Sequence, residues 1–334
     1  MHASARTSTL SITSPADLAA AIPSLLGFHP EHSLVIVYLA GDAVALTVRF
    51  DLPLTEEVTA HAADLVDTAN ATNTLAVLIA SHQEVDEHRP GLAQLKERLE
   101  SGGAPLRDAL LIEDNRFWSL ACDTLECCPA EGTAVPQACA VEADGVMRGI
   151  PTPASSREAF LTRFMHTPDP EITTGVIEAA RAHLAGPLRQ QGERAWSALQ
   201  RLCAAGPRGR IAVRLDRAIV WEALVDVRVR DFLILLITET PDALPLVEQL
   251  TDLALASPER YLARTAGTAA FVQYTHGRSL PAQALCELAG EDSLATLVRV
   301  AANSALPPEH LRQGMHDIRG TVLERLGDTA RPSA

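Results

Sequence analysis

The chain contains no long run of lysine or arginine, and its 28 basic side chains are outnumbered by 42 acidic ones. The formal net charge of −14 repels the phosphate backbone of nucleic acids and the surface of anionic membranes. A nucleic-acid or membrane partner is therefore not expected.

Long apolar segments are absent too. The N-terminal sequence MHASARTSTLSITSPADL has no apolar stretch of the about 7 to 15 residues that follow a basic start in secretory signal peptides. The most apolar run, DFLILLI at Asp231–Ile237, falls far short of the about 20 residues that cross a bilayer. We expect a cytoplasmic protein, in which cysteines are more often free thiols or metal ligands than disulfides.

Motifs that mark common enzyme classes are also missing. The sequence has no nucleophile elbow, no Gly-rich phosphate loop and no H-E-x-x-H zinc motif. The two glycines of SGGAPL at Ser101–Leu106 lack the lysine and the preceding strand that a phosphate loop requires. These absences favour a binding or regulatory protein over an enzyme.

The first part of the chain alternates between helix-like and strand-like segments. Ser14 suits a helix N-cap and Gly27 a helix end, whereas Pro23 cannot donate to the carbonyl of Ala19 and should kink or interrupt the helix. Further helices are predicted at 55–69 and through 91–101, and strands at 33–39, 43–52, 74–80, 108–113 and 116–121. This alternation predicts a mixed-sheet α/β layer domain at residues 8–122.

The character of the sequence changes after Cys122. Residues 123–154 are rich in Pro, Gly, Ala and Glu, which predicts a long loop or linker. Residues 155–328 are predicted to form an α-helical domain, for which stacked helical hairpins are one arrangement that fits. Breaks at proline and glycine predict helices at 156–166, 171–185, 187–204, 215–237 with an interruption, 242–256, 258–275, 279–289, 292–304 and 307–326. The predicted fold class is α+β or α/β, with an all-helical C-terminal part.

Two stretches resemble a known family. SPADLAAAIPSLLGFHPEHSLVIVYLAGDAVALTVRFDLP (Ser14–Pro53) and RFWSLACDTLECCPAEGT (Arg116–Thr133) are similar to the actinobacterial domain of unknown function family 4192, whose members carry PADLLAAVPYLLGFHP and C….CCP.EGT segments. The family's GDGALA segment corresponds to GEDSLA at Gly290–Ala295, and its members commonly have Asp in place of His32. The resemblance implies an α/β N-terminal part, a helical C-terminal part and no settled activity.

Three cysteines, Cys122, Cys127 and Cys128, fall within seven residues. Adjacent Cα atoms are about 3.8 Å apart, below the usual disulfide range, so a bond between Cys127 and Cys128 would be strained. Pro129 favours an extended Cys128, whose side chain then points away from that of Cys127. We expect at most two of the three thiols to share one ligand.

Zinc is one interpretation of this cluster. Cys122 and Cys127 form a C-x4-C pair, and a second pair would have to come from Cys139, His82 or His88, because the chain has no C-x2-C pair. A reactive or redox-sensitive thiol is another, and packing of small buried side chains is the one we favour. The two remaining cysteines are predicted to lie in the helical core: Cys203 and Cys286.

The loop GFHPEHS, between the first predicted helix and strand, is the second candidate site. Loops of this kind often display binding residues, which here are Phe28, His29, Pro30 and Glu31; His29 and Glu31 could act as an acid and a base. In the simpler interpretation, Phe28 packs as a plug, Pro30 fixes the turn and His29 satisfies a backbone carbonyl. We favour it, because a histidine without a located partner is no catalytic constellation.

The functional hypothesis is a cytoplasmic, non-enzymatic binding or regulatory protein. Its helical domain would bind a protein partner, and its α/β domain would carry a small-molecule pocket near the His29 loop and the Cys122–Cys128 loop. The alternative is an enzyme or zinc protein with a Cys/His centre that Cys122, Cys127 or Cys128 forms with His29.

Overall fold

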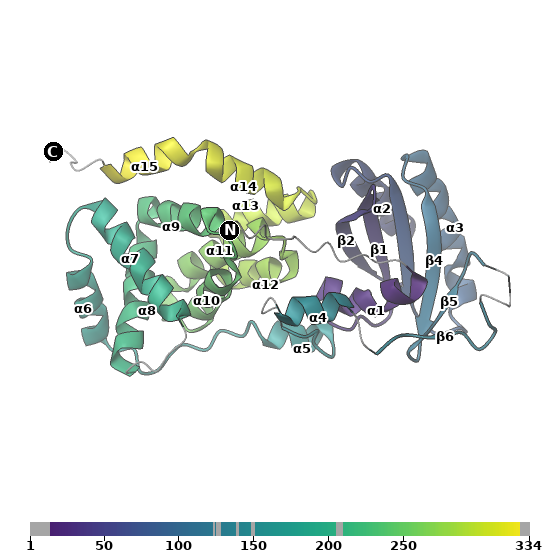
Figure 1. The fold of residues 1–334 in the computed structure, drawn as a ribbon, viewed down its shortest axis with the longest axis horizontal. Helices are drawn as coiled ribbons and strands as arrows, with labels where there is room; N and C mark the ends of the chain where they lie inside the picture. Colours follow the sequence, from purple (N-terminus) through teal and green to yellow (C-terminus); the bar gives the residue numbers. More distant parts are fainter. Residues whose placement is uncertain are drawn as a thin grey trace, which may run out of the picture. The chain divides into compact units, whose positions relative to one another are not determined.

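The chain divides into two compact units, Met1–Phe160 and Leu161–Ala334. The first holds a sheet with its helices, and the second is helical (Figure 1). The structure is a computed structural model, and it describes residues 14–122, 124, 128–137, 140–147, 151–204 and 210–327.

A six-stranded mixed sheet organises the described part of the first unit. Its strand order is β2-β1-β3-β4-β5-β6, with β3 and β4 parallel and the other neighbours antiparallel. This confirms the predicted α/β layer architecture. The strands are β1 Ser33–Ala40, β2 Ala43–Asp51, β3 Asn73–Ile79, β4 Leu106–Glu113, β5 Arg116–Ser119 and β6 Thr133–Ala134.

Helices cover both faces of this sheet. Helices α2 (Glu56–Thr68) and α3 (Val85–Ser101) pack against each other behind the sheet in Figure 1, and α1 (Pro15–Leu26) lies in front, against β4 and β5. Strand β1 is buried on both faces, and the Tyr38 hydroxyl donates a 2.7 Å hydrogen bond to the Ala62 carbonyl of α2. The core is therefore continuous through the sheet.

Local sequence signals account for the bounds of α1. The Ser14 hydroxyl accepts a 3.1 Å hydrogen bond from the Asp17 N–H, and Gly27 ends the helix with φ of 79°. The helix continues through Pro23 as one element, so it does not restart there, whereas the predicted kink stays a prediction. Burial of the apolar face of α1 against the sheet outweighs the loss of one hydrogen bond.

Some elements extend beyond what the sequence predicts. Helix α3 begins at Val85, six residues before the predicted start at residue 91, and it contains Pro90. The described part of 123–154, predicted as a loop or linker, contains β6 and α4 (Ala140–Met147). Helix α5 (Arg157–Thr162) follows.

The second unit is helical, as predicted. The predicted interruption within 215–237 lies at Asp226, whose carboxylate accepts a 2.9 Å hydrogen bond from the Arg228 N–H at the start of α9. The segment 307–326 forms two helices instead of one. The helices are α6 Thr174–His183, α7 Leu188–Cys203, α8 Arg210–Val225, α9 Val227–Glu239, α10 Leu244–Leu255, α11 Glu259–Thr275, α12 Ser279–Ala289, α13 Ser293–Asn303, α14 Pro308–Asp317 and α15 Arg319–Gly327.

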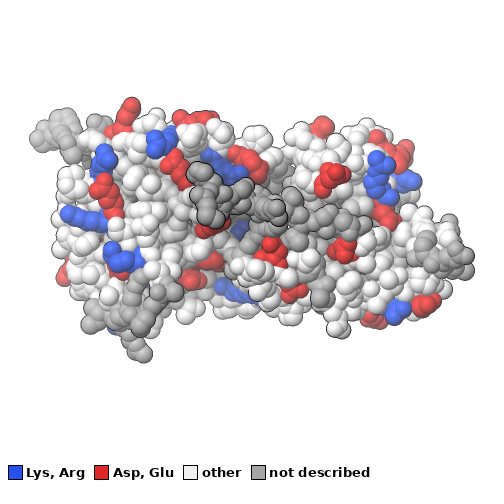
Figure 2. Space-filling model, in the orientation of Figure 1, with Lys and Arg blue, Asp and Glu red and all other residues white. Residues whose placement is uncertain are grey.

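Helix α11 lies at the centre of this unit and contacts α8, α9, α10, α12, α13 and α14. Within the described ranges, no helix combines the length and the apolar character of a membrane span. On the face drawn in Figure 2, acidic and basic side chains are interspersed.

Candidate functional site

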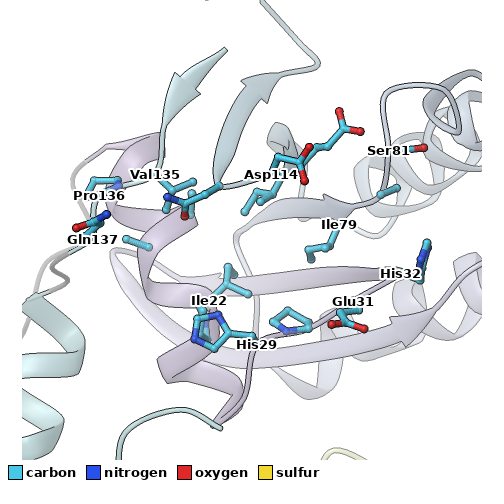
Figure 3. Close-up of a pocket in the computed structure, with 18 of the residues that line it drawn as sticks. Ile22, His29, Glu31, His32, Ile79, Ser81, Asp114, Val135, Pro136 and Gln137 are labelled. Carbon is cyan, nitrogen blue, oxygen red and sulfur yellow. The ribbon is translucent and has the colours of Figure 1, made fainter. Parts of the chain in front are cut away.

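A cavity of about 580 Å³ opens at one edge of the sheet (Figure 3). The strand register shows how it forms, because Ser33 at the start of β1 pairs with Ile79 at the end of β3, which pairs in turn with Ile112 of β4. The segment before β1 and the segments after β3 and β4 therefore meet at this edge. It is the carboxyl edge of the parallel strand pair, where α/β proteins commonly bind ligands.

One wall of the cavity is apolar. Helix α1 contributes one side of it, and Pro23, which has no N–H to donate to the Ala19 carbonyl, lies on this side. The apolar residues of the wall are Ala19, Ala20, Ile22, Pro23, Ile79, Ala80, Ile112, Val135 and Pro136.

The polar lining is acidic. Among the described residues that line the cavity, no lysine or arginine occurs. Figure 3 shows Glu31 and Asp114 on opposite sides of the cavity, with Ile79 between them in this view. The polar lining residues are the carboxylates Glu31, Glu113, Asp114 and Glu142, the imidazoles His29 and His32, and the neutral Ser81, Asn115 and Gln137.

The GFHPEHS loop is hydrogen-bonded to Ala154, a residue distant in the sequence. The Ala154 carbonyl accepts a 2.9 Å hydrogen bond from the His29 N–H, and the Ala154 N–H donates one of the same length to Gly27. Phe28 is 2% exposed, and its ring lies 6.0 Å from that of Phe160. A Cβ at Gly27, whose φ is 79°, would lie 3.1 Å from the Phe160 ring, so glycine suits this close approach.

The four residues predicted as binding residues therefore separate into two groups. Phe28 is a buried anchor beneath the loop. His29, Pro30 and Glu31 line the cavity, and the side chains of His29 and Glu31 are exposed. The backbone N–H of His29, rather than its imidazole, satisfies the carbonyl of Ala154.

A carboxylate close to the cavity organises the loop after β3. The N–H and the hydroxyl of Ser81 both donate to Glu84 Oε2, at 2.9 and 2.8 Å. These hydrogen bonds lower the pKa of Glu84, because they favour its charged form. His32 Nδ1 lies 4.0 Å from Glu84 Oε1. The donors of Ser81 are thus occupied by a neighbouring side chain.

The turn between β4 and β5 forms the opposite rim. Asp114 and Asn115 have φ of 45° and 61°, which suits the tight hairpin turn predicted at these residues. The Asn115 carbonyl accepts a 2.9 Å hydrogen bond from the Val135 N–H. This bond places Val135 and Pro136 against the cavity.

Beside this rim, strand β5 holds a segment that we call the edge clasp, residues 130–132. The Trp118 indole N–H donates to the Ala130 carbonyl at 3.0 Å, and Arg116 Nη2 donates to the Gly132 carbonyl at 2.8 Å. Gly132 has φ of 72°, and a Cβ there would lie 2.3 Å from the Trp118 ring. Arginine, tryptophan and glycine of the RFW…EGT stretch therefore form a packing unit.

His82 connects the edge clasp to the cavity. Its Nδ1 lies 2.9 Å from Glu113 Oε2, and its ring meets the Trp118 ring edge-on at a centroid distance of 4.2 Å. Glu113 lines the cavity. The His82 imidazole thus contacts both Glu113 and Trp118, so a change at Glu113 can alter the environment of Trp118.

Comparison with protein families identifies the relationship of the chain. A family model described as a domain of unknown function, DUF4192, matches residues 15–309 of the 334-residue chain. The chain belongs to the DUF4192 family. Comparisons with curated proteins and with solved structures gave no match. The match spans both units, so it covers the cavity and the edge clasp.

In this DUF4192 chain, the cysteine cluster is described in part. Cys122 and Cys128 are partly exposed, whereas Cys127 and Cys139 lie outside the described residues. Within the described ranges, no group of three or more His, Cys, Asp or Glu side chains could hold a metal ion. Zinc bound by Cys122, Cys127 and Cys128 stays a prediction.

The two histidines considered as further zinc ligands have other surroundings in this DUF4192 chain. His82 pairs with Glu113, and His88 is buried on α3.

Binding of a protein partner by the helical region stays a prediction.

Several cavity residues of this DUF4192 chain were not singled out from the sequence. Glu113 ends β4 and Asp114 follows it, and the rule that ligands bind beyond the carboxyl ends of parallel strands could have found them. Ser81 follows the other strand of the pair in the same way. Pro136 and Glu142 lie in the segment predicted as a linker, and no local signal connects them with the sheet.

Proposed function

We propose that the α/β unit of this protein binds a small organic molecule in the cavity at the carboxyl edge of β3 and β4. One observation carries the proposal, namely an edge cavity of about 580 Å³ with an apolar wall and a polar rim. Ligand sites commonly enclose about 300 to 1,000 Å³ and combine apolar walls with a few convergent polar groups.

Binding is preferred to the alternative of a Cys/His enzyme. His29 lines the cavity with an exposed side chain, but the described lining contains no cysteine, so the cavity does not supply the nucleophile that this alternative requires. His82 connects Glu113 of the lining with Trp118. Ligand contact at Glu113 is expected to change the fluorescence of Trp118.

The experiment is a fragment screen by saturation-transfer NMR on the full chain, repeated on a variant with a smaller cavity. Ala20 is half-buried and lines the cavity, so Ala20→Phe should fill part of it. Ala16 lies one turn earlier on the same helix and outside the lining, which makes Ala16→Phe the matched control.

Fragments that bind in the cavity should lose at least about tenfold in affinity with Ala20→Phe, and keep their affinity with Ala16→Phe. Both variants should keep the far-UV circular dichroism of the parent chain. Equal binding by the parent chain and Ala20→Phe would place the ligand elsewhere and overturn the proposal.

A further inference from the structure

We infer that the ligand of this cavity is an organic cation, a compound with a protonated amine on an apolar body. The inference rests on the proposed function and names its ligand class. It follows from the charge, the hydrogen-bonding groups and the apolar wall of the cavity, taken in turn.

The charge of the lining has one sign. Four carboxylates line the cavity, and within its described lining no lysine or arginine faces them. Arg116 follows the β4–β5 turn, but its guanidinium donates to the carbonyls of Glu131 and Gly132 in the edge clasp. The negative charge of these carboxylates would repel an anionic ligand and attract a cationic one.

The hydrogen-bonding groups of the cavity include carboxylates that accept but cannot donate. Glu31 and Asp114 are exposed and have no ion-pair partner among the described residues. The donors of Ser81 are both directed at Glu84. A ligand that brings N–H donors complements these groups, because a carboxylate accepts its strongest hydrogen bonds from charged donors.

The apolar wall distinguishes an organic cation from a metal ion. Ile22, Ile79, Ile112 and Val135 offer no ligand atoms to a hydrated metal, yet they suit a hydrocarbon body. A volume of about 580 Å³ also exceeds what one ion fills. In Figure 3, Ile22 and Ile79 lie between the loop that carries Glu31 and the turn that carries Asp114. The amine would therefore meet the carboxylates while its apolar part covers the isoleucines.

The test uses three probes of similar shape, namely phenethylamine, phenethyl alcohol and phenylacetate. Each is titrated against the full chain, with tryptophan fluorescence and saturation-transfer NMR as readouts. We expect the amine to bind about tenfold more tightly than the alcohol, since hydrogen bonds to charged groups are the stronger ones, and phenylacetate to bind most weakly. The preference for the amine should shrink as the salt concentration rises.

The charge variant is Glu31→Gln with Asp114→Asn, and its control is Asp64→Asn with Glu97→Gln, which removes the same charge from exposed positions on α2 and α3. The cavity variant should weaken amine binding about tenfold and leave alcohol binding unchanged. The control variant should change neither.

The outcomes separate this inference from the proposed function. If the alcohol or phenylacetate binds as tightly as the amine, and Ala20→Phe weakens that binding, the cation inference is overturned and the binding function stands. If no probe shows binding that Ala20→Phe weakens, both are overturned.

Discussion

Two aspartates, one in each unit, have opposite surroundings. In the helical unit, buried Asp216 is satisfied by Arg201, whose Nη2 and Nε lie 2.5 and 3.1 Å from its two oxygens. In the α/β unit, Asp114 stands exposed at a cavity rim without an ion-pair partner in the described part of the chain. Carboxylates of the first kind stabilise the fold, whereas those of the second kind remain available to a ligand.

The edge clasp of the α/β unit combines backbone hydrogen bonds with a close contact between Gly132 and Trp118, and Gly132→Ala tests this contact. The left-handed φ of Gly132 and the collision of a Cβ with Trp118 should together reduce the free energy of unfolding by about 3 kcal/mol. Urea unfolding followed by tryptophan fluorescence measures this loss.

The matched control for the clasp is Gly103→Ala. Gly103 also has a left-handed φ, 86°, but no neighbour lies within 4 Å of its Cβ position, so backbone strain alone should cost about 1 kcal/mol. Equal losses at the two glycines would show that contact with Trp118 contributes nothing.

The same substitution in both units sharpens the comparison further. Asp216→Asn removes a buried charge that Arg201 binds with two nitrogens, and should lower the free energy of unfolding by about 1 to 3 kcal/mol. Asp114→Asn should leave it unchanged, because asparagine tolerates the φ of 45° and the carboxylate is exposed. Urea unfolding followed by circular dichroism measures both free energies. A larger loss of stability in Asp114→Asn than in Asp216→Asn would contradict the contrast between the two aspartates.

A smaller, pH-dependent effect is expected at His276, which ends α11. Its Nδ1 lies 2.8 Å from the Val272 carbonyl, and burial lowers its pKa below the ordinary value of 6.5. The folded state thus binds fewer protons than the unfolded state just below this pH, so stability should fall as the pH drops through 6.5 and level off below the folded-state pKa. Urea midpoints at neutral and mildly acidic pH should differ less in His276→Gln than in the parent chain. A parent chain whose midpoint rises on acidification would contradict this sign.

The smallest expected effect concerns the chemical reactivity of the Cys286 thiol and involves no change in stability. Burial raises the pKa of the Cys286 thiol to about 11, and its Sγ lies 3.5 Å from the Ala295 carbonyl. Because the thiolate is the reactive form, a maleimide at neutral pH should modify Cys286 last among the described cysteines. Peptide mass spectrometry over a time course gives the order, and early labelling of Cys286 would show that its helix opens readily.

Much of the fold could be predicted from local sequence signals. Helix α12 has its predicted bounds, and the interruption between α8 and α9 lies within the segment that predicted it. Such elements depend on caps, prolines and periodicity within a few residues. Pro23 misled because its effect on α1 is decided by packing against the sheet, which no local signal reports.

The candidate site was harder to predict for the same reason. The His29 loop could be recognised by its place between a helix and a strand, but the opposite rim is assembled from strand ends and from 135–137, far away along the chain. The edge clasp depends on Trp118 meeting Gly132. Contacts of this kind are set by topology and register, which a single sequence does not display.

The bonds between Ala154 and the loop at Gly27–His29 have a consequence for synthesis of the chain. When 122 residues have emerged from the ribosome, strands β1 to β5 are complete. The loop at the cavity rim then still lacks Ala154, to which it hydrogen-bonds, and Phe160, against which Phe28 packs. The pocket can thus mature only after the nascent polypeptide has passed residue 160. Expression fragments meant to retain it should end beyond that point rather than at the cysteines.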